Sequence, residues 1–224
     1  MDGNGRWARS RGLPRIAGHR RGADAVRATV KAAVALGVRY LTLFGFSSEN
    51  WKRPFAEVED LMGLLRRYLR SEVSELHSQG VRLRVIGDRA RMAPDINALI
   101  ADAEALTAGN RNLTLTLALS YGGRAEIATA ARRIAAKVAA GEMTVDAVDE
   151  AAMSANMYTA DLPDPDLLIR TSGEQRISNF LLWQCAYAEM LFLDVLWPDF
   201  GHDQLAAAVR EFGRRERRYG MAGR

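Results

Sequence analysis

Short apolar runs that alternate with stretches of helical periodicity are the strongest constraint on how this chain can fold. Residues 40–46 (YLTLFGF) and 113–119 (LTLTLAL) are almost continuous in apolar or β-forming side chains, as expected of strands covered on both faces. The expected strands are 40–46, 81–86, 113–119, 167–169 and 190–193, and the expected helices are 19–36, 56–79, 94–108, 123–140 and 203–218. This alternation predicts a single α/β domain over residues 1–224, with a mostly parallel central sheet flanked by helices.

The composition is that of an ordinary soluble protein. Hydrophobic residues make up 48% and charged residues 26% of the chain. The most apolar tract, 180–197, is interrupted by Gln184, Glu189 and Asp194, which favours a core segment over a membrane span. No signal peptide is visible, and the single cysteine, Cys185, excludes a disulfide framework. We therefore expect a cytoplasmic protein.

The charge pattern argues against a nucleic-acid partner. A formal charge of +4 is too small to indicate one by itself. The most basic cluster, residues 210–218, is interleaved with Glu211 and Glu216, which is typical of a solvated helix face with internal ion pairs. We expect no nucleic-acid binding.

The first seven residues, MDGNGRW, concentrate groups that bind phosphate. Glycines let backbone N–H groups approach a ligand closely, and Arg6 offers a planar fork of donors suited to phosphate oxygens. Asp2 would repel a bare diphosphate, so its position near Arg6 suggests a bridging cation such as Mg²⁺. Asp, Gly and Asn are also common turn formers, and the segment alone leaves a phosphate site and an N-terminal turn equally open.

Polar loops follow two of the expected strands. Residues 47–53 (SSENWKR) and 170–178 (RTSGEQRIS) carry hydroxyls, amides and guanidinium groups, and ligands of parallel α/β sheets bind at the carboxyl ends of the strands. Glu189 lies inside an apolar run, where a carboxylate is costly unless it is paired or metal-bound. Each feature taken singly is also compatible with a polar loop, a surface ion pair or a satisfied strand-end carboxylate. Together they predict two anion sites and two cation ligands, Asp2 and Glu189, on one sheet edge.

The order and spacing of these segments resemble the cis-prenyltransferases, and most closely the bacterial undecaprenyl diphosphate synthases, or isoprenyl transferases. The matching segments are MDGNGRW, GHRRGA (18–23), FSSENWKRP (46–54), SYGGR (120–124), IRTSGEQRISNFLLWQ (169–184) and VLWPDF (195–200). The resemblance runs from Asp2 to about Tyr219, and the chain lacks the Asp-Asp-x-x-Asp motif of the all-helical trans-prenyltransferases.

The resemblance implies a role for each matched residue. Asp2 would hold Mg²⁺ against an allylic diphosphate, and Glu189 would complete the Mg²⁺ site. The other implied contacts to the allylic diphosphate are Gly3, Asn4, Gly5, Arg6, Trp7, Arg15 and His19, with the dipole of a helix beginning near Gly18 aimed at the same group. Residues implied to line the reacting centre are Ser47, Ser48, Glu49, Trp51 and Arg53, with Asn50 placed to assist proton removal. Arg170, Arg176 and Ser178, with Ile177 beside them, would bind isopentenyl diphosphate.

The implied reaction adds isopentenyl diphosphate repeatedly to farnesyl diphosphate and gives a long-chain polyprenyl diphosphate. The undecaprenyl carrier-lipid precursor for cell-wall synthesis is the expected product, and Mg²⁺ is the expected cofactor. The proton acceptor stays open among Asp2, Asn50 with a water, and the substrate diphosphate. The resemblance also implies a homodimer, and the apolar product makes a transient membrane-surface contact for its release an expectation.

A growing apolar chain needs an apolar tunnel. Side chains of helix 56–79 and of strand 113–119 are candidates for its walls, with Leu113 near the floor. The helix candidates are Leu61, Leu64, Leu65, Tyr68 and Leu69. On pattern alone these residues are more typical of plain core.

The chain departs from the common family pattern at three places. Gln175 stands where many relatives carry His, and Gly45 replaces a frequent Ala. Only Met1 precedes Asp2 where relatives carry a strand, so we expect the given start to be truncated and the domain to lack its N-terminal strand. An alternative function is that of a non-catalytic binding subunit in a heteromeric prenyltransferase, although such subunits typically lose the Asp-Gly-Asn-Gly-Arg segment retained here.

Overall fold

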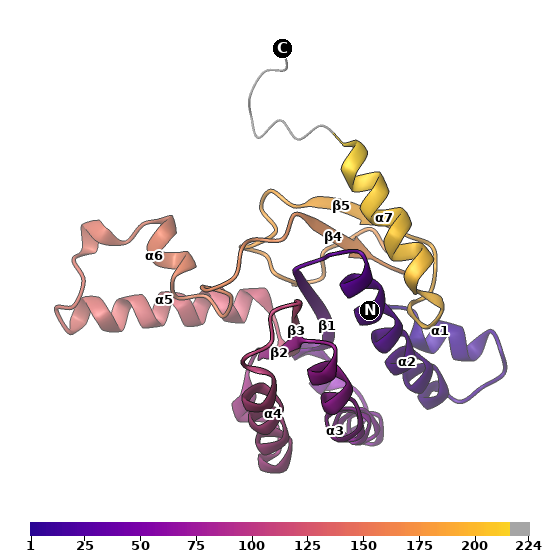
Figure 1. The fold of residues 1–224 in the computed structure, drawn as a ribbon. Coiled ribbons are helices and arrows are strands. Elements are labelled where there is room, and N and C mark those ends of the chain that lie inside the picture. Colours follow the sequence, from indigo (N-terminus) through magenta and orange to yellow (C-terminus); the bar gives the residue numbers. More distant parts are fainter. Residues whose placement is uncertain (216–224) are drawn as a thin grey trace.

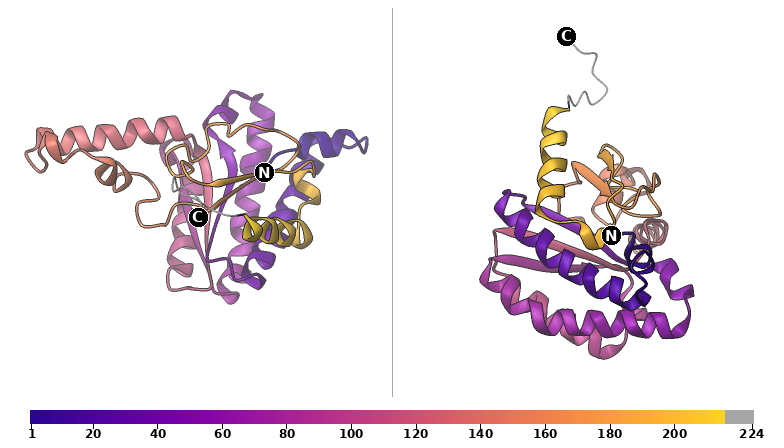
Figure 2. Two further views of the ribbon diagram at one scale, coloured as in Figure 1. Left: turned by 90° about the horizontal axis from the view of Figure 1, so that it is seen from above. Right: turned by 90° about the vertical axis from the view of Figure 1, so that its right-hand side faces the viewer.

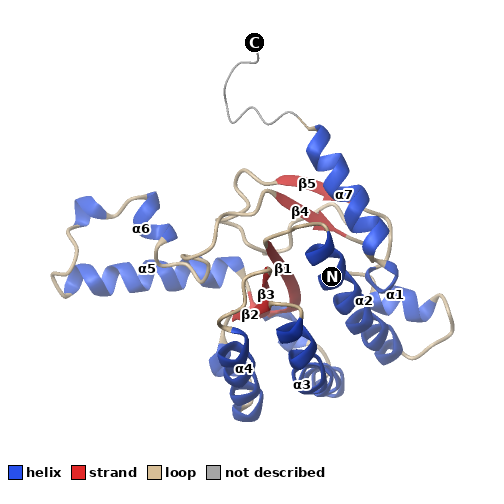
Figure 3. Cartoon of the chain, viewed as in Figure 1, coloured by secondary structure: helices blue, strands red, loops and turns tan. Residues whose placement is uncertain are grey.

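Five parallel strands form two small sheets in the computed structural model, which describes residues 1–215 (Figure 1). β1 (Tyr40–Ser47), β3 (Leu113–Tyr121) and β2 (Val81–Ile86) make a sheet in the order β1-β3-β2, and β4 (Leu167–Arg170) pairs with β5 (Glu189–Phe192). Every strand pair is parallel, which confirms the α/β fold class. The expected central sheet is divided into these two parts (Figure 3).

The helices surround the two sheets. They are α1 (Asn4–Arg9), α2 (Arg15–Ala35), α3 (Phe55–Ser78), α4 (Pro94–Thr107), α5 (Gly123–Ala139), α6 (Glu150–Ser154) and α7 (His202–Arg214), with 3-10 turns η1 (Ser48–Lys52), η2 (Arg89–Arg91), η3 (Val145–Ala147) and η4 (Trp197–Asp199). Figure 2 shows α5 and α6 extending away from the body as an arm. The last part of the expected helix 203–218, from 216 onward, lies outside the described residues.

β3 is the most deeply buried strand because both of its faces are covered. Leu113, Leu115 and Leu117 face the main core, which α2, α3 and α4 close from one side. Ala118 and Tyr121 face a second cluster built from β4 and the loop that follows it. This burial explains why the strand reads as an almost unbroken apolar run.

The expected helix starts need one correction. α2 begins at Arg15, so Gly18 lies inside the helix and is not its first residue. α1 crosses α2 closely at this point, because a Cβ on Gly18 would lie 2.0 Å from the Asn4 carbonyl oxygen. One turn further, a Cβ on Gly22 would lie 2.4 Å from Asn4 Oδ1. Because Gly18 and Gly22 of the GHRRGA segment have no Cβ, Asn4 of the heptapeptide can pack directly against α2.

The sequence did not predict that the heptapeptide becomes a short helix. Gly5 lowers the intrinsic helix propensity of α1, and a helix of six residues is marginal on its own. Gly3 precedes α1 with φ +105°, a left-handed value that glycine adopts without strain. Packing on α2 and η4 supplies the stability that the local sequence lacks.

Helix glycines in different surroundings predict opposite effects on stability. Gly18→Ala should lower the free energy of unfolding by about 2 kcal/mol, because the methyl group overlaps the Asn4 carbonyl. Gly63→Ala in α3 is the matched control, because nothing lies within 4 Å of a Cβ there, and it should raise the free energy of unfolding by about 0.5–1 kcal/mol. Urea unfolding curves test both. A stabilising Gly18→Ala would contradict the close α1–α2 crossing.

Candidate active site

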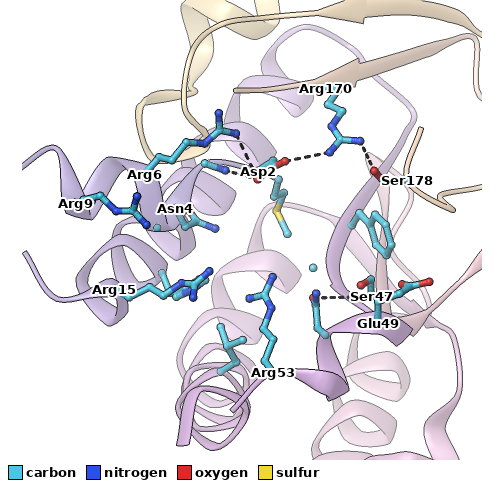
Figure 4. Close-up of a pocket in the computed structure, with 18 of the residues that line it drawn as sticks. Asp2, Asn4, Arg6, Arg9, Arg15, Ser47, Glu49, Arg53, Arg170 and Ser178 are labelled. Carbon is cyan, nitrogen blue, oxygen red and sulfur yellow. Dashed lines mark hydrogen bonds and ion pairs between the residues drawn. The ribbon is translucent and has the colours of Figure 1, made fainter. Parts of the chain in front are cut away.

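A polar pocket with a cavity volume of about 840 Å³ opens between α1, α2, β1, η1 and the end of β4 (Figure 4). Its lining comes from three regions of the sequence, residues 1–19, 44–61 and 170–179. The lining residues are Met1, Asp2, Gly3, Asn4, Gly5, Arg6, Arg9, Leu13, Arg15, His19, Phe44, Gly45, Ser47, Glu49, Asn50, Arg53, Leu61, Arg170, Ser178 and Asn179. The register between β1 and β3 is interrupted at Gly45, so the strand is irregular where it borders the pocket.

Asp2 is fixed at both its backbone and its side chain. Its N–H donates to Thr171 Oγ1 at 3.1 Å, and its carbonyl accepts from the Trp197 N–H at 2.9 Å. Its carboxylate accepts from Arg170 at 3.1 Å and from the Gly3 N–H at 2.7 Å. Burial alone would raise the pKa of Asp2, but the Arg170 and Gly3 hydrogen bonds and the Arg170 charge lower it overall. The carboxylate is therefore ionised and faces the pocket.

The VLWPDF segment anchors the heptapeptide. The indole of Trp197 donates to the Gly22 carbonyl at 2.9 Å, and the Asp199 carboxylate accepts from Trp7 Nε1 at 2.8 Å. Arg11 stacks over the Trp7 ring and also reaches Asp199 at 3.3 Å. Trp7 thus lies beside the pocket and serves to attach α1, and it is absent from the lining.

Arginines outnumber carboxylates around the pocket. Five arginines (Arg6, Arg9, Arg15, Arg53 and Arg170) line it against two carboxylates, Asp2 and Glu49. Such an excess of positive charge in a concave site attracts anions. Each guanidinium carries five donors in a planar fork, so several N–H groups stay available to the oxygens of a diphosphate.

Neighbouring groups orient these arginines. Arg6 donates to Ser172 Oγ at 2.6 Å and pairs with Glu174 at 3.0 Å. Glu57, four residues after Arg53, forms ion pairs with both Arg53 at 2.8 Å and Arg15 at 3.0 Å. These contacts point the guanidinium groups into the pocket from opposite walls (Figure 4).

Two buried polar atoms in the lining have no partner. They are His19 Nε2 and Asn4 Oδ1. An unpaired buried polar atom is destabilising unless a ligand or water completes it. Burial, followed by the nearby Arg53 charge, lowers the pKa of His19 below its ordinary value. The ring beside the arginines is therefore neutral in the free protein.

The η1 turn supplies the far wall. The Ser47 N–H donates to Asn50 Oδ1 at 3.0 Å and fixes the start of the turn. Glu49 Oε1 accepts from Asn179 Nδ2 at 2.8 Å. Burial works to raise the pKa of Glu49, but the Asn179 hydrogen bond and others within the turn lower it overall.

Several expected site residues lie next to the lining. Trp51 donates to Ser120 Oγ at 2.9 Å and packs edge-on against Phe46. Ser48 borders Gly122. Arg176 pairs with Glu174, and Ile177 packs on the second core cluster. The substrate contacts assigned to Ser48, Trp51, Arg176 and Ile177 stay predictions.

Glu189 does not share the sheet edge with the other site residues, as the sequence analysis had expected. In the β4–β5 register Leu167 pairs with Glu189, and Arg170 pairs with Phe192, so Glu189 sits at the amino end of the pair while Arg170 sits at the carboxyl end. Three residues along a strand span about 10 Å. The Glu189 carboxylate accepts from Arg215 at 2.9 Å. The described residues contain no group of three His, Cys, Asp or Glu side chains suited to a metal.

Asp2 nevertheless fits a Mg²⁺ ion that arrives with a diphosphate. Mg²⁺ is usually bound through one or two carboxylates together with substrate phosphates and waters, without an all-protein cage. The side chain of Asp2 is 42% exposed at the pocket, and the surrounding arginines supply the matching phosphate contacts.

The pocket touches only part of the proposed tunnel. Leu61 lines it, whereas Leu69 and Leu113 are buried in the core and Leu64 lies outside the lining. Leu65 and Tyr68 pack against the same core. A separate cavity of about 10 Å³ borders Tyr68 between α2 and α3. The tunnel and its floor stay predictions.

Sequence reasoning missed several residues that shape the site. Thr171 and Ser172 hold Asp2 and Arg6, and both lie in a loop that the sequence had marked as polar. Glu57 was detectable as the i+4 partner of Arg53. Asn179 carried no local signal, because its partners are distant in the sequence.

Comparisons with known proteins show the family to which the chain belongs. The family model described as "Putative undecaprenyl diphosphate synthase" matches residues 1–220. Isoprenyl transferases of Agrobacterium fabrum and Zymomonas mobilis are 54% and 56% identical over 220 residues, covering 98% of this chain and 89% of each relative.

Solved structures agree as well. Lavandulyl diphosphate synthase from Lavandula x intermedia, solved in complex with dimethylallyl diphosphate, is 39% identical with a TM-score of 0.96, covering 98% of this chain and 95% of that one. A probable undecaprenyl diphosphate synthase from Campylobacter jejuni is 35% identical with a TM-score of 0.79, covering 90% and 92%. The chain belongs to the cis-prenyltransferase family and is a prenyl-transferring enzyme.

Proposed function

We propose that this enzyme condenses isopentenyl diphosphate repeatedly onto farnesyl diphosphate or a similar allylic diphosphate, with Mg²⁺ as cofactor. The observation that carries the proposal is the ionised carboxylate of Asp2 in a pocket that five arginines line. The proposed product is a long-chain cis-polyprenyl diphosphate, the undecaprenyl precursor of a cell-wall carrier lipid.

The heptapeptide forms the allylic site in this proposal. Arg6, Arg15, the glycine N–H groups and the NH₂ group of Asn4 bind the diphosphate, and the unpaired Nε2 of His19 donates to it. The lavandulyl diphosphate synthase relative was solved with dimethylallyl diphosphate, which supports an allylic diphosphate as the ligand. Mg²⁺ held by Asp2 would stabilise the negative charge that builds on the leaving diphosphate.

The loop after β4 forms the second substrate site. Arg170, Arg176, Ile177 and Ser178 hold isopentenyl diphosphate, and Arg170 already donates to Ser178 Oγ at 2.6 Å. Glu189 is kept in the proposal as a further Mg²⁺ ligand. It would have to exchange its Arg215 partner for the metal.

Arginines on both walls align the two substrates for carbon–carbon bond formation. They stabilise the departing diphosphate while the C4 alkene carbon of isopentenyl diphosphate attacks the allylic carbon. A C2 proton then leaves, and Asp2, Asn50 with a water, or the diphosphate accepts it. Asn50 lines the pocket, and its oxygen already accepts from the Ser47 N–H, which fixes the side chain so that its NH₂ group can orient a water.

The setting of the enzyme is also proposed. Tyr187, Met190 and Phe192 expose apolar side chains on and beside β5, which supports a homodimer through this surface.

Leu13 and Phe55 are exposed near the pocket, which supports a brief membrane-surface contact for product release by a cytoplasmic enzyme. No helix among residues 1–215 is long and apolar enough to cross a bilayer. The retained Asp-Gly-Asn-Gly-Arg segment disfavours a non-catalytic subunit.

The proposed reaction predicts incorporation of labelled isopentenyl diphosphate into an extracted apolar product. Incorporation should require farnesyl diphosphate and Mg²⁺, stop with a chelator and return when Mg²⁺ is restored. Chain-length analysis of the product then fixes the number of additions. Purified protein that incorporates no label with any allylic primer would contradict the proposal.

The role of Asp2 predicts that Asp2→Asn lowers turnover by at least about a hundredfold. Asparagine keeps an oxygen for the Gly3 N–H but removes the charge that binds Mg²⁺ and Arg170. The main-chain contacts to Thr171 and Trp197 remain, so the thermal unfolding curve should change little. Nearly full activity in a folded variant would remove Asp2 from this role.

His19 predicts a pH dependence of diphosphate binding. Its pKa is lowered in the free protein, and a bound diphosphate raises it by adding negative charge nearby. Because the bound pKa exceeds the free pKa, binding takes up a proton and gains affinity as the pH falls. The ratio of wild-type to His19→Gln affinity for pyrophosphate should rise several-fold from about pH 8 to about pH 6. A ratio that is flat across this range would show that His19 does not titrate on binding.

A further inference from the structure

Asn179 joins three segments of the pocket wall that are far apart in the sequence. Its Nδ2 donates to Glu49 Oε1 at 2.8 Å, and its Oδ1 accepts from the Arg124 N–H at 2.8 Å. Its backbone carbonyl accepts from the Gly123 N–H, also at 2.8 Å. One asparagine therefore connects η1, the first turn of α5 and the loop after β4. We call these three hydrogen bonds the Asn179 clamp.

The backbone around Asn179 is unusual. Asn179 has φ +62°, and Ser178 and Leu181 have φ +50° and +40°. Non-glycine residues in the left-handed region are strained and persist only where the surrounding structure determines their conformation. Asparagine tolerates this region better than most residues. A strained loop of this kind is held in place by its contacts, and the clamp supplies them.

Gly122 makes room for the clamp. A Cβ at Gly122 would lie 2.6 Å from Ser48 Oγ and 2.8 Å from Asn179 Nδ2. No larger residue fits without moving one of these groups. The Ser-Tyr-Gly-Gly-Arg segment thus receives a physical role: Gly122 gives space, and Gly123 and Arg124 give N–H donors.

The clamp is continuous with the anion-binding side of the pocket. Ser178 directly precedes Asn179, and its hydroxyl accepts from Arg170 at 2.6 Å. Arg170 in turn binds the Asp2 carboxylate at 3.1 Å. Both Glu49 and Asn179 line the pocket. A displacement of Asn179 would therefore move Ser178 and Arg170 relative to the η1 wall.

We propose that Asn179 is a positioning residue, which sets the distance between the η1 wall and the Arg170–Ser178 anion site by donating to Glu49. This inference rests on the proposed function, because it assigns the clamped loop to isopentenyl diphosphate. Its effect falls on the affinity for that substrate, since the clamp touches neither α1 nor the arginines of the allylic wall.

Reversing the donor and the acceptor tests the proposal. Asn179→Asp keeps the oxygen for the Arg124 N–H but places a carboxylate against Glu49, so the KM for isopentenyl diphosphate should rise by about tenfold or more. The double variant Asn179→Asp with Glu49→Gln restores one donor and one acceptor in reversed order. Its KM should return to within about threefold of Glu49→Gln alone. The KM for the allylic substrate should stay within about twofold in Asn179→Asp relative to the wild type, and in the double variant relative to Glu49→Gln alone.

Asn179→Gly is the matched control for the backbone. Glycine adopts φ +62° without strain and keeps the backbone bond to Gly123. It removes both side-chain bonds of the clamp, so its KM should resemble that of Asn179→Asp and not that of the wild type. Thermal unfolding of each variant confirms that kinetics are compared between folded proteins. Wild-type kinetics in Asn179→Gly, or no recovery in the folded double variant, would overturn the proposal.

A binding measurement separates this inference from the proposed function. Isopentenyl diphosphate alone, without an allylic primer, serves as the probe in calorimetric titrations of the same variants, and its binding needs no turnover. If the wild type transfers no prenyl group, the proposed function fails, and the clamp is still judged by loss of isopentenyl diphosphate affinity in Asn179→Asp and its return in the double variant. Equal isopentenyl diphosphate affinity in the wild type, Asn179→Asp and Asn179→Gly would overturn the clamp in that case.

Discussion

The hydrogen bonds that hold the main chain of Asp2 are the constraint on which the rest of the site depends. The Thr171 side chain, 169 residues away, both accepts from the Asp2 N–H and donates to its carbonyl, while the Trp197 N–H donates to the same carbonyl. These contacts connect the start of the chain to β4 and η4. They direct the carboxylate into the pocket and place it beside Arg170. This part of the anion site therefore depends on the packing of the N-terminal segment against the segments that follow β4 and β5.

Sequence patterns predicted the elements well and their assembly only in part. Apolar periodicity located the strands because β3 is buried on both faces, and Gly37 and Gly80 end α2 and α3 with φ of +72° and +70°. Local patterns could not show that the heptapeptide becomes a helix, because packing on Gly18 decides it. Nor did they place Glu189 correctly: it begins β5 while Arg170 ends β4, and parallel pairing puts these positions at opposite ends.

The pocket is organised as a balance of charges that substrate can rearrange. Glu57 holds Arg15 and Arg53, Glu174 holds Arg6, and Asp2 holds Arg170. These carboxylates orient the arginines but accept only some of their N–H groups. The remaining N–H groups are positioned to donate to a diphosphate. The unpaired His19 nitrogen adds one more group that gains a partner on binding. Preorganised donors of this kind favour the transition state in which a diphosphate leaves.

The most direct test of the account is the Mg²⁺ dependence of pyrophosphate binding to the wild type and to Asp2→Asn, measured by calorimetry. The account predicts that Mg²⁺ strengthens wild-type binding by about tenfold or more and that this gain disappears in Asp2→Asn, while the five arginines still give weak binding without the metal. An equal gain from Mg²⁺ in a folded Asp2→Asn variant would contradict the assignment of Asp2 as the residue that joins the metal to the diphosphate.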